Sequence, residues 1–479
     1  MVSPLRAILV LITGALLLSC GSSSSTTALA KPGISTVVIT AIDTNTNTNA
    51  RAKAVAVQSD GKIVAAGYWY DGAKNVFALA RYINDGVTDG TLDGSFGTGG
   101  IVTTPVGTVD AEAQAMVIQP DGKLVVAGFS YNGSQYVFTL ARYINDGVTD
   151  GALDASFGSG GIVATPVGSV DDRAFAVAIQ SDGKIVVAGY SSVVTGTSIQ
   201  SRIALARYIN DGVTDGALDG SFGAGGMVAT TVAVASGASA NALAVEPDPN
   251  PPNGDLLIVA GVANGVSVTT GSTTTTQDVF LVARYKEDGS ADSTFNGGDA
   301  SNMTGVVTTA VGTVKDQAYA VAIQPSDGNV VVAGSSFVTA QRQMALARYN
   351  ALDGTLDTTF NKTGTVTTAI DANSTASALA IQPADGKLVA AGTGYNNTYG
   401  EFILARFNTD GHLDGTFSSG GKVTTAITYG AEAFGLAIQP ADGKPIAAGY
   451  SQARGESEQF TLVRYTTAGK VDTTFPPQP

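Results

Sequence analysis

The sequence predicts an all-β fold, a seven-bladed β-propeller that follows a lipoprotein signal peptide. Three observations predict it. One unit recurs seven times in the 479-residue chain, its strands are short and almost continuously apolar, and the two ends of the repeat region complement each other. Repeats that cannot bury their own faces must stack on one another, and a closed ring of them leaves no open sheet edge.

The repeated unit contains four expected strands. In the first copy, AVAVQSDGKIVAAG (Ala54–Gly67) contains the first two, AVAVQ and KIVAAG, and FALARY (Phe77–Tyr82) is the third. The fourth lies in the stretch from LDGSFG (Leu92–Gly97) to GIVTT (Gly100–Thr104). The Asp-Gly in the first phrase is typical of a tight hairpin turn, because glycine readily adopts positive φ. The glycine of this turn recurs at Gly61, Gly122, Gly183, Gly254, Gly328, Gly386 and Gly443. Strands with apolar residues at nearly every position are expected to be buried on both faces, as in a blade between two neighbours.

The ends of the repeat region predict closure of the ring. The last copy stops at Val471–Phe475 and lacks its final VTT strand, whereas Thr36–Thr40 (TVVIT) supplies a matching segment before the first copy. A solenoid would instead need a cap at each end. The sequence leaves open whether this strand completes the last blade or opens the first.

Three phrases carry a family resemblance: AVAIQSDGKIVVAG (Ala176–Gly189), ALARY (Ala204–Tyr208) and LDGSF (Leu218–Phe222). The units resemble the delta-60 repeat, a bacterial β-propeller repeat of largely unknown function. The resemblance extends from residue 34 to the C-terminus and implies a propeller fold and export. It brings no catalytic residues to this chain.

The N-terminus predicts a lipid anchor. A short basic segment precedes the apolar run Ala7–Leu18, which suits a signal peptide and is too short to span a bilayer. The following Leu17-Leu18-Ser19-Cys20 resembles a bacterial lipobox, which implies that Cys20 is lipidated. We therefore expect a signal peptide over 1–19, a lipidated cysteine and Ser/Thr-rich tether over 20–33, and the propeller over 34–479. Gly21 resembles outer-membrane sorting signals, so the expected location is the bacterial outer membrane, on either its periplasmic or its external side.

Composition restricts the function. The net charge of −14 makes nucleic acid an unfavourable partner, because phosphate backbones repel an acidic surface. Cys20 is the single cysteine, which excludes an intramolecular disulfide, and His412 is the single histidine, which excludes metal sites with two imidazoles. We expect a monomer that contacts the membrane through its lipid.

Two repeated polar features have a structural interpretation. Each unit carries an arginine (Arg81, Arg142, Arg207, Arg284, Arg348, Arg406 and Arg464) and an aspartate (Asp93, Asp154, Asp219, Asp292, Asp357, Asp414 and Asp472). We expect each arginine to satisfy the aspartate or turn carbonyls of its own blade, since buried charges are usually paired. The segment INDGVTDG (Ile83–Gly90 and two copies) is acidic but lacks known calcium-loop spacing, so we interpret it as a lengthened turn. Calcium remains a minor alternative, and no other cofactor is expected.

Variable segments identify one face as a recognition surface. Turns between the first and second strands are nearly uniform, whereas connections on the opposite face, such as YWYDGAKN (Tyr68–Asn75) and TGYNNTYGE (Thr393–Glu401), vary and carry aromatic residues. Flat aromatic rings suit sugars or protein surfaces. The candidate contact residues are Trp69, Tyr70, Tyr131, Tyr395 and Tyr399. The alternative is that some of these rings merely cover blade edges.

Acidic residues on the same face form the second candidate site. They are expected near the axis: Asp110, Glu112, Asp171, Asp172, Asp316, Asp371 and Glu432. The sequence favours a non-enzymatic envelope module that binds a protein or glycan through the aromatic face. The alternative is a propeller hydrolase or lyase acting on envelope sugars or lactones, with these carboxylates as acid–base groups and calcium as a possible cofactor. A third interpretation is a purely structural spacer.

Overall fold

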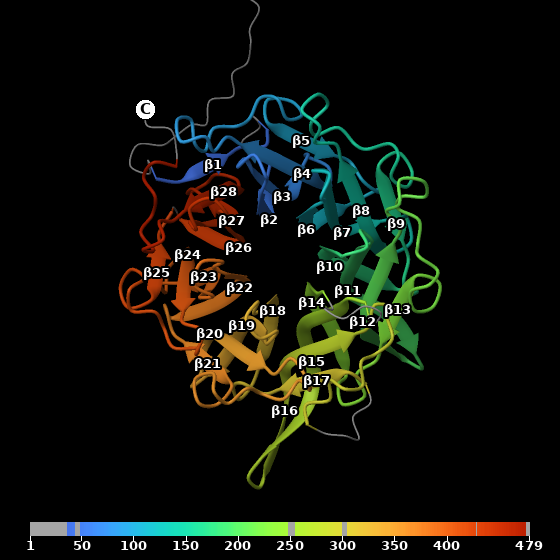
Figure 1. The fold of residues 1–479 in the computed structure, drawn as a ribbon, viewed down its shortest axis with the longest axis vertical. Helices are drawn as coiled ribbons and strands as arrows, with labels where there is room; N and C mark the ends of the chain where they lie inside the picture. Colours follow the sequence, from blue (N-terminus) through green and yellow to red (C-terminus); the bar gives the residue numbers. More distant parts are fainter. Residues whose placement is uncertain (1–35, 44–47, 248–253, 299–303, 428, 476–479) are drawn as a thin grey trace, which may run out of the picture.

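A computed structural model describes residues 36–43, 48–247, 254–298, 304–427 and 429–475. The expected signal peptide, Cys20 and the whole tether lie outside these residues. The described chain forms seven four-stranded antiparallel sheets arranged as blades around a central axis (Figure 1). The predicted seven-bladed propeller is confirmed.

In each blade, the first strand named below lies nearest the axis and the fourth lies at the periphery (Figure 1). The first blade contains β2 (Ala50–Val57), β3 (Ile63–Tyr70), β4 (Asn75–Tyr82) and β5 (Ile101–Thr104). The second contains β6 (Ala111–Ile118), β7 (Leu124–Tyr131), β8 (Tyr136–Tyr143) and β9 (Ile162–Thr165). The third contains β10 (Asp171–Ile179), β11 (Ile185–Thr195), β12 (Ser198–Tyr208) and β13 (Met227–Thr230).

The remaining blades repeat this order. The fourth contains β14 (Gly237–Glu246), β15 (Leu256–Thr270), β16 (Thr273–Tyr285) and β17 (Val306–Thr309). The fifth contains β18 (Asp316–Ile323), β19 (Val330–Val338), β20 (Gln341–Tyr349) and β21 (Thr365–Thr368). The sixth contains β22 (Asn373–Ile381), β23 (Leu388–Tyr395), β24 (Gly400–Phe407) and β25 (Lys422–Thr425). The seventh contains β26 (Gly430–Ile438), β27 (Pro445–Gln452), β28 (Gln459–Arg464) and the N-terminal β1 (Val38–Thr40).

Strand β1 completes the last blade, which settles the alternative that the sequence left open. It pairs antiparallel with β28, with Val38 opposite Leu462 and Thr40 opposite Phe460. Tyr82 of the first blade donates a hydrogen bond to Thr40 Oγ1 at 2.9 Å. The next blade repeats this contact, since Tyr143 donates to Thr104 Oγ1 of the first blade. Strand β1 therefore occupies the place of an ordinary fourth strand and joins the two ends of the chain.

The hydrophobic cores lie between adjacent blades. In one of them Val64 and Leu79 of the first blade pack with Leu124 and Tyr143 of the second, all fully buried. Apolar residues on both faces of the middle strands are needed for this arrangement, which explains the continuous apolar runs. Each blade is thus stabilised by its two neighbours.

The repeated arginines pair with the aspartate of their own blade, as predicted, and also reach the next blade. Arg81 Nε donates to Asp93 Oδ2 at 2.8 Å, and its Nη2 donates to Asp150 Oδ2 of the second blade at 2.6 Å. Arg464 of the last blade makes the corresponding ion pair with Asp89 of the first blade at 2.8 Å. A planar head with several donors can make such contacts at once.

The acidic INDGVTDG segments serve these contacts between blades. Asp85 Oδ1 accepts hydrogen bonds from the backbone N–H groups of Val87 and Thr88, which fixes the turn. Asp89 Oδ1 accepts from the N–H of Gly86, and its other oxygen pairs with Arg464. The segment is therefore a lengthened turn, as expected, that also holds the preceding blade.

Candidate ligand-binding channel

The seven inner strands surround an axial cavity of about 680 Å³. Each inner strand has a β-bulge at the same place, for example between Ala52 and Ala54 of β2. The bulge residues of the seven blades are Lys53, Gln114, Phe175, Asn241, Tyr319, Ser377 and Phe434, and all of them line the cavity. Bulges often redirect side chains toward functional sites. The cavity volume falls within the roughly 300–1,000 Å³ usual for small-molecule sites.

A repeated glycine makes room for each bulge. A Cβ atom on Gly67 would lie 1.9 Å from the backbone oxygen of Arg51, and Gly128 meets Glu112 at the same distance. The other five blades place a glycine at the corresponding position of their second strand. The invariant glycine in phrases such as IVAAG is therefore required for close approach of two backbones.

The cavity changes from polar to apolar along its length. Two residues deeper than the bulges lies a ring of aliphatic and methionine side chains: Val55, Met116, Val177, Leu243, Val321, Leu379 and Leu436. An outer ring lies two residues before the bulge residues, toward the start of each inner strand. It consists of Arg51, Glu112, Arg173, Ser239, Gln317, Thr375 and Glu432. The deep ring is uniform in character, whereas the bulge ring and the outer ring differ from blade to blade.

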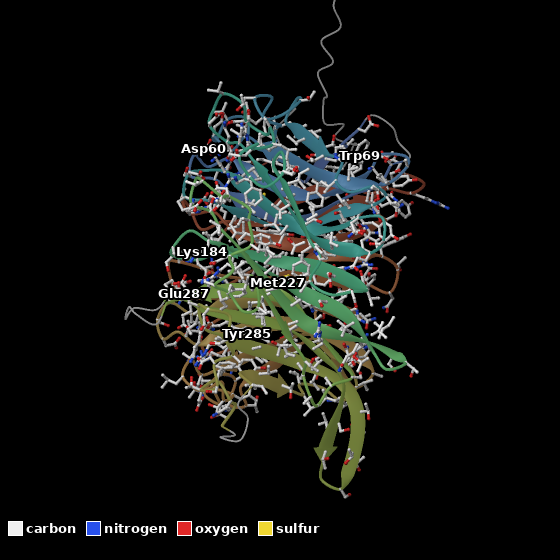
Figure 2. The ribbon with its side chains drawn as sticks, turned by 90° about the vertical axis from the view of Figure 1, so that its right-hand side faces the viewer. Asp60, Trp69, Lys184, Met227, Tyr285 and Glu287 are labelled. Carbon is white, nitrogen blue, oxygen red and sulfur yellow. The ribbon has the colours of Figure 1, made fainter. Side chains whose placement is uncertain are left out.

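The polar end opens on the face that carries the variable segments. Ala50 at the start of β2 pairs with Trp69 near the end of β3, so this end lies beside the β3–β4 connection. Trp69 lies on one side of the disc, and the uniform turns with Asp60, Lys184 and Glu287 lie on the other (Figure 2). The variable face and the polar mouth are thus one continuous surface.

Lys53 is the charged member of the bulge ring. Its Nζ lies 3.5 Å from the centroid of the Phe434 ring and 5.9 Å from that of Tyr68. It forms no hydrogen bond or ion pair with any residue that the structure describes. Burial and, to a smaller extent, the charge of Arg51 lower the pKa of Lys53 to about 8. An ammonium over an aromatic ring keeps free N–H donors for a ligand.

Arg342 of the fifth blade and Glu432 of the seventh blade, which is adjacent to the blade of Lys53, supply the other charges of the lining. The Arg342 guanidinium lies 5.2 Å from the centroid of Phe337 and has no ion pair within the described ranges. Glu432 Oε1 accepts a hydrogen bond from the hydroxyl of Tyr395 at 2.9 Å. Burial and the neighbouring Glu432 raise the pKa of Tyr395 to about 12, so this hydroxyl stays protonated.

An aromatic arc borders the mouth where the last blade meets the first blades. Arg51 forms a bidentate pair with Glu458 at 2.5 and 2.6 Å and lies 4.5 Å from the centroid of Tyr450. Arg173 lies over both Phe129 and Tyr136, at 4.6 and 4.4 Å from their centroids, and these two rings pack edge-on against each other. Paired and stacked arginines hold these rings in place, so the arc is a preformed surface.

The predicted aromatic residues occupy different positions on this face. Tyr395 lines the channel and is 42% exposed. Tyr70 and Tyr399 are exposed on the rim, and Tyr399 packs edge-on against Tyr429 at 5.2 Å. Tyr131 packs edge-on against Tyr136.

Trp69, like Tyr131, is only partly exposed. It packs against the core between the first and last blades, which includes Ile63 and Phe460. Its buried Nε1 has no hydrogen-bond partner among the described residues. The position of this ring fits the alternative of covering a blade edge better than that of a free contact.

Three of the predicted acidic residues lie on the channel side of their strands: Glu112, Asp171 and Glu432. Glu112 accepts hydrogen bonds from Gln114 and Asn75, and burial raises its pKa. Asp171 accepts from the Tyr190 hydroxyl at 2.6 Å. These residues alternate with buried alanines along the inner strands, as expected for a strand with one face toward a channel.

The other predicted carboxylates belong to loop structure or lie apart. Asp172 and Asp316 are fully buried on the opposite side of their strands, where they accept from the backbone N–H groups of their own connecting loops. Asp110 accepts from the N–H of Asn75. Asp371 Oδ2 is buried without a partner in the described part, and burial raises its pKa. The structure therefore does not gather all seven residues at one site.

No group of three or more His, Cys, Asp or Glu side chains among the described residues is arranged to hold a metal ion. Within the same residues, no helix has the length and apolar character needed to cross a bilayer. Neither finding tests the expected calcium alternative or the lipid anchor.

Sequence reasoning missed the bulge residues, above all Lys53, Phe175 and Phe434. A signal was present, since aligning the seven copies shows that the bulge position varies between neighbouring blades within an otherwise Ala-rich strand. The sequence also predicts that the variable segments are loops, but most of them extend the strands on either side. The longest, β15 and β16, form a hairpin that projects from the disc (Figure 1).

Several solved structures are similar to this chain at low sequence identity. Solved structures similar to this chain include a protein of unknown function from Dyadobacter fermentans, with 12% identity over 89% of this chain and 97% of that one and a TM-score of 0.36. The GH93 α-L-arabinofuranosidase of Fusarium graminearum has 11% identity over 90% and 97%, with a TM-score of 0.41. A PL25 ulvan lyase has 10% identity over 89% and 95%, with a TM-score of 0.42. At these identities and scores the likenesses carry no argument about function.

A comparison with curated proteins finds no match. Seven segments of the chain, however, match one family, described as a domain of unknown function (DUF5122) beta-propeller. The matched residues are 58–96, 119–157, 180–222, 257–295, 326–360, 384–417 and 441–475, one segment in each blade. They cover more than half of the sequence, so this chain belongs to the DUF5122 β-propeller family.

Proposed function

We propose that this protein is a lipid-anchored binding module of the bacterial envelope that takes up a glycan at the polar mouth of its axial channel. The observation that carries the proposal is the bulge ring. The seven repeats have nearly the same strands and turns. The bulge residue that faces the cavity, however, differs between any two neighbouring blades. A scaffold under structural constraint alone has no need for this variety.

The chemistry of the lining suits a sugar. Phe175 and Tyr319 offer flat rings for the faces of pyranoses, Phe434 adds an apolar wall beneath Lys53, and Gln114 and Asn241 offer amides for hydroxyl groups. A concave site with apolar walls and a few convergent polar groups is the usual form of a small-molecule site. A folded protein partner would instead require a broad surface, of which the exposed rim tyrosines supply only isolated contacts.

The anchor follows from the N-terminal sequence, which lies outside the described residues. Leu17-Leu18-Ser19-Cys20 supports lipidation of Cys20, and the Ser-rich tether would let the propeller stand away from the bilayer. With this arrangement, the module would hold a glycan close to the cell surface or the periplasmic wall.

The test is binding of the full-length protein in detergent to an array of oligosaccharides from bacterial and plant polysaccharides. The double variant Phe175→Ala/Phe434→Ala removes two aromatic walls of the channel, and Tyr70→Ala/Tyr399→Ala is the matched control on the rim. Loss of binding in the first variant alone supports the channel. Equal binding by both variants, or no glycan bound by the wild type, would refute the proposal. Release of shortened products from a bound glycan would favour the hydrolase or lyase alternative.

A further inference from the structure

The charges that line the channel are unusual for this chain. The protein has a net charge of −14, but its cavity contains two cationic side chains, Lys53 and Arg342, and one carboxylate, Glu432. Clefts with one dominant sign of charge favour ligands of the opposite sign, because low-dielectric walls concentrate the field. The excess of positive charge is confined to the cavity lining, because at the mouth Arg51 pairs with Glu458 and Arg173 pairs with Asp171. Glu112 and Glu432 lie near Lys53 and partly offset the lowering of its pKa.

Both cations lack the partners that other cations of this protein have. Arg81 and Arg142 are in ion pairs with aspartates, and so are Lys62 and Lys123 on the opposite face. By contrast, Lys53 rests on Phe434 and Arg342 beside Phe337, with no anion within ion-pair distance in the described chain. Burying an ammonium group without a partner costs free energy unless another group compensates its charge.

The nearest carboxylates are occupied by neutral donors. Glu432 accepts the hydrogen bond of Tyr395, and Glu112 accepts those of Gln114 and Asn75. Arg51, the cation next to Lys53 on the same strand, is neutralised by Glu458. The free donors of Lys53 are therefore directed to the space of the channel rather than to protein acceptors.

We infer that the channel binds an acidic saccharide, whose anionic group contacts Lys53. The anionic group is a carboxylate, as in a uronic acid, or a sulfate ester; both present oxygen acceptors to an ammonium. Arg342 faces the same cavity and would attract the anionic group of a further sugar unit. This inference rests on the proposed function, since it specifies the class of glycan.

The protonation of Lys53 gives the inference a pH signature. Its pKa of about 8 means that the free protein loses this charge as the pH rises from 7 to 9. The affinity for an acidic saccharide should fall over that range, and binding at pH 8 should take up protons from the buffer. A neutral saccharide should show neither effect.

The experiment measures binding of the full-length protein in detergent to three probes of equal length: an oligogalacturonate, a sulfated galacto-oligosaccharide and a neutral galacto-oligosaccharide. The variants are Lys53→Gln and Lys53→Arg, with Lys123→Gln as the matched control on the opposite face. Thermal unfolding confirms that each variant is folded. We expect one or both acidic probes to bind at least about tenfold more tightly than the neutral one, a preference that Lys53→Gln abolishes and Lys53→Arg largely keeps.

The outcomes separate the two proposals. Preference for galacturonate identifies a carboxylate site, and preference for the sulfated probe identifies a sulfate site. Equal affinity for acidic and neutral probes, or an acidic preference unchanged in Lys53→Gln, refutes the inference while leaving glycan binding in place. Absence of any saccharide binding here and on the array refutes the proposed function itself.

Discussion

Arg142 provides the sharpest test of how the blades are held together. Its side chain is 1% exposed; Nε donates to Asp154 of its own blade at 2.9 Å, and Nη2 donates to Asp215 Oδ2 of the next blade at 2.6 Å. In the variant Arg142→Met, Asp154 would keep its contacts with Lys123 and Ser156. Asp215 would lose its cation and keep only the N–H of Gly212.

The expected cost follows from the unpaired buried carboxylate. Removing one partner of a buried ion pair costs about 3–5 kcal/mol in the free energy of unfolding. The control Lys123→Met removes a cation from the same Asp154, but this lysine is 32% exposed and reaches no other blade. Its loss should cost about 0–1 kcal/mol, as for surface ion pairs.

The assay is urea unfolding of both variants and of the wild type. Adding Asp215→Asn to Arg142→Met should cost much less than adding it to the wild type, because the two residues contact each other. If Arg142→Met and Lys123→Met cost the same, or if the effects of Arg142→Met and Asp215→Asn simply add, the contact between blades is not what stabilises the ring.

Three further predictions concern the turns, the bulges and the anchor. Although burial alone would raise their pKa, hydrogen bonds from Ser or Thr and the charges of Lys and Arg lower the pKa of Asp93, Asp154, Asp219 and Asp472 to about 2. These groups stabilise the fold above about pH 4, and their contribution is lost as the pH falls toward 2, so the melting temperature should drop over that interval; a constant value would contradict the assignment. Gly67→Ala places a Cβ 1.9 Å from the oxygen of Arg51 and should destabilise the protein by about 1–3 kcal/mol, whereas Gly94→Ala, with nothing within 4 Å, should have little effect in the same unfolding assay. Cys20→Ala should abolish incorporation of labelled palmitate, and a variant still labelled would exclude lipidation at this cysteine.

The repeat pattern was sufficient to predict the architecture. The periodic turn glycines predicted seven blades, and TVVIT at the N-terminus predicted closure, because a missing strand and its complement stand at opposite ends of the chain. The order of the strands in each sheet follows from short connections between sequential neighbours. The sequence could not place β1 in the last blade, since that depends on which sheet offers an unpaired edge.

The channel was harder to predict. An Ala-rich strand such as ARAKAVAV shows alternation, but nothing in it reveals the bulge at Lys53, which depends on pairing with Gly67 of the next strand. Contacts between blades were missed for a similar reason. Arg81 and Asp93 recur within one unit and suggest each other, whereas Asp150 belongs to the next copy and becomes a partner only when adjacent blades pack together.

The measurement that tests the central claim most directly is photocrosslinking of an oligosaccharide that carries a diazirine group, followed by mass spectrometry of the labelled peptides. The account predicts labels on the channel side of the inner strands, in peptides containing Lys53, Phe175 and Phe434, and competition by the unlabelled sugar. Labels confined to the rim hairpins around Tyr70 and Tyr399, or spread over the uniform face, would contradict binding in the channel.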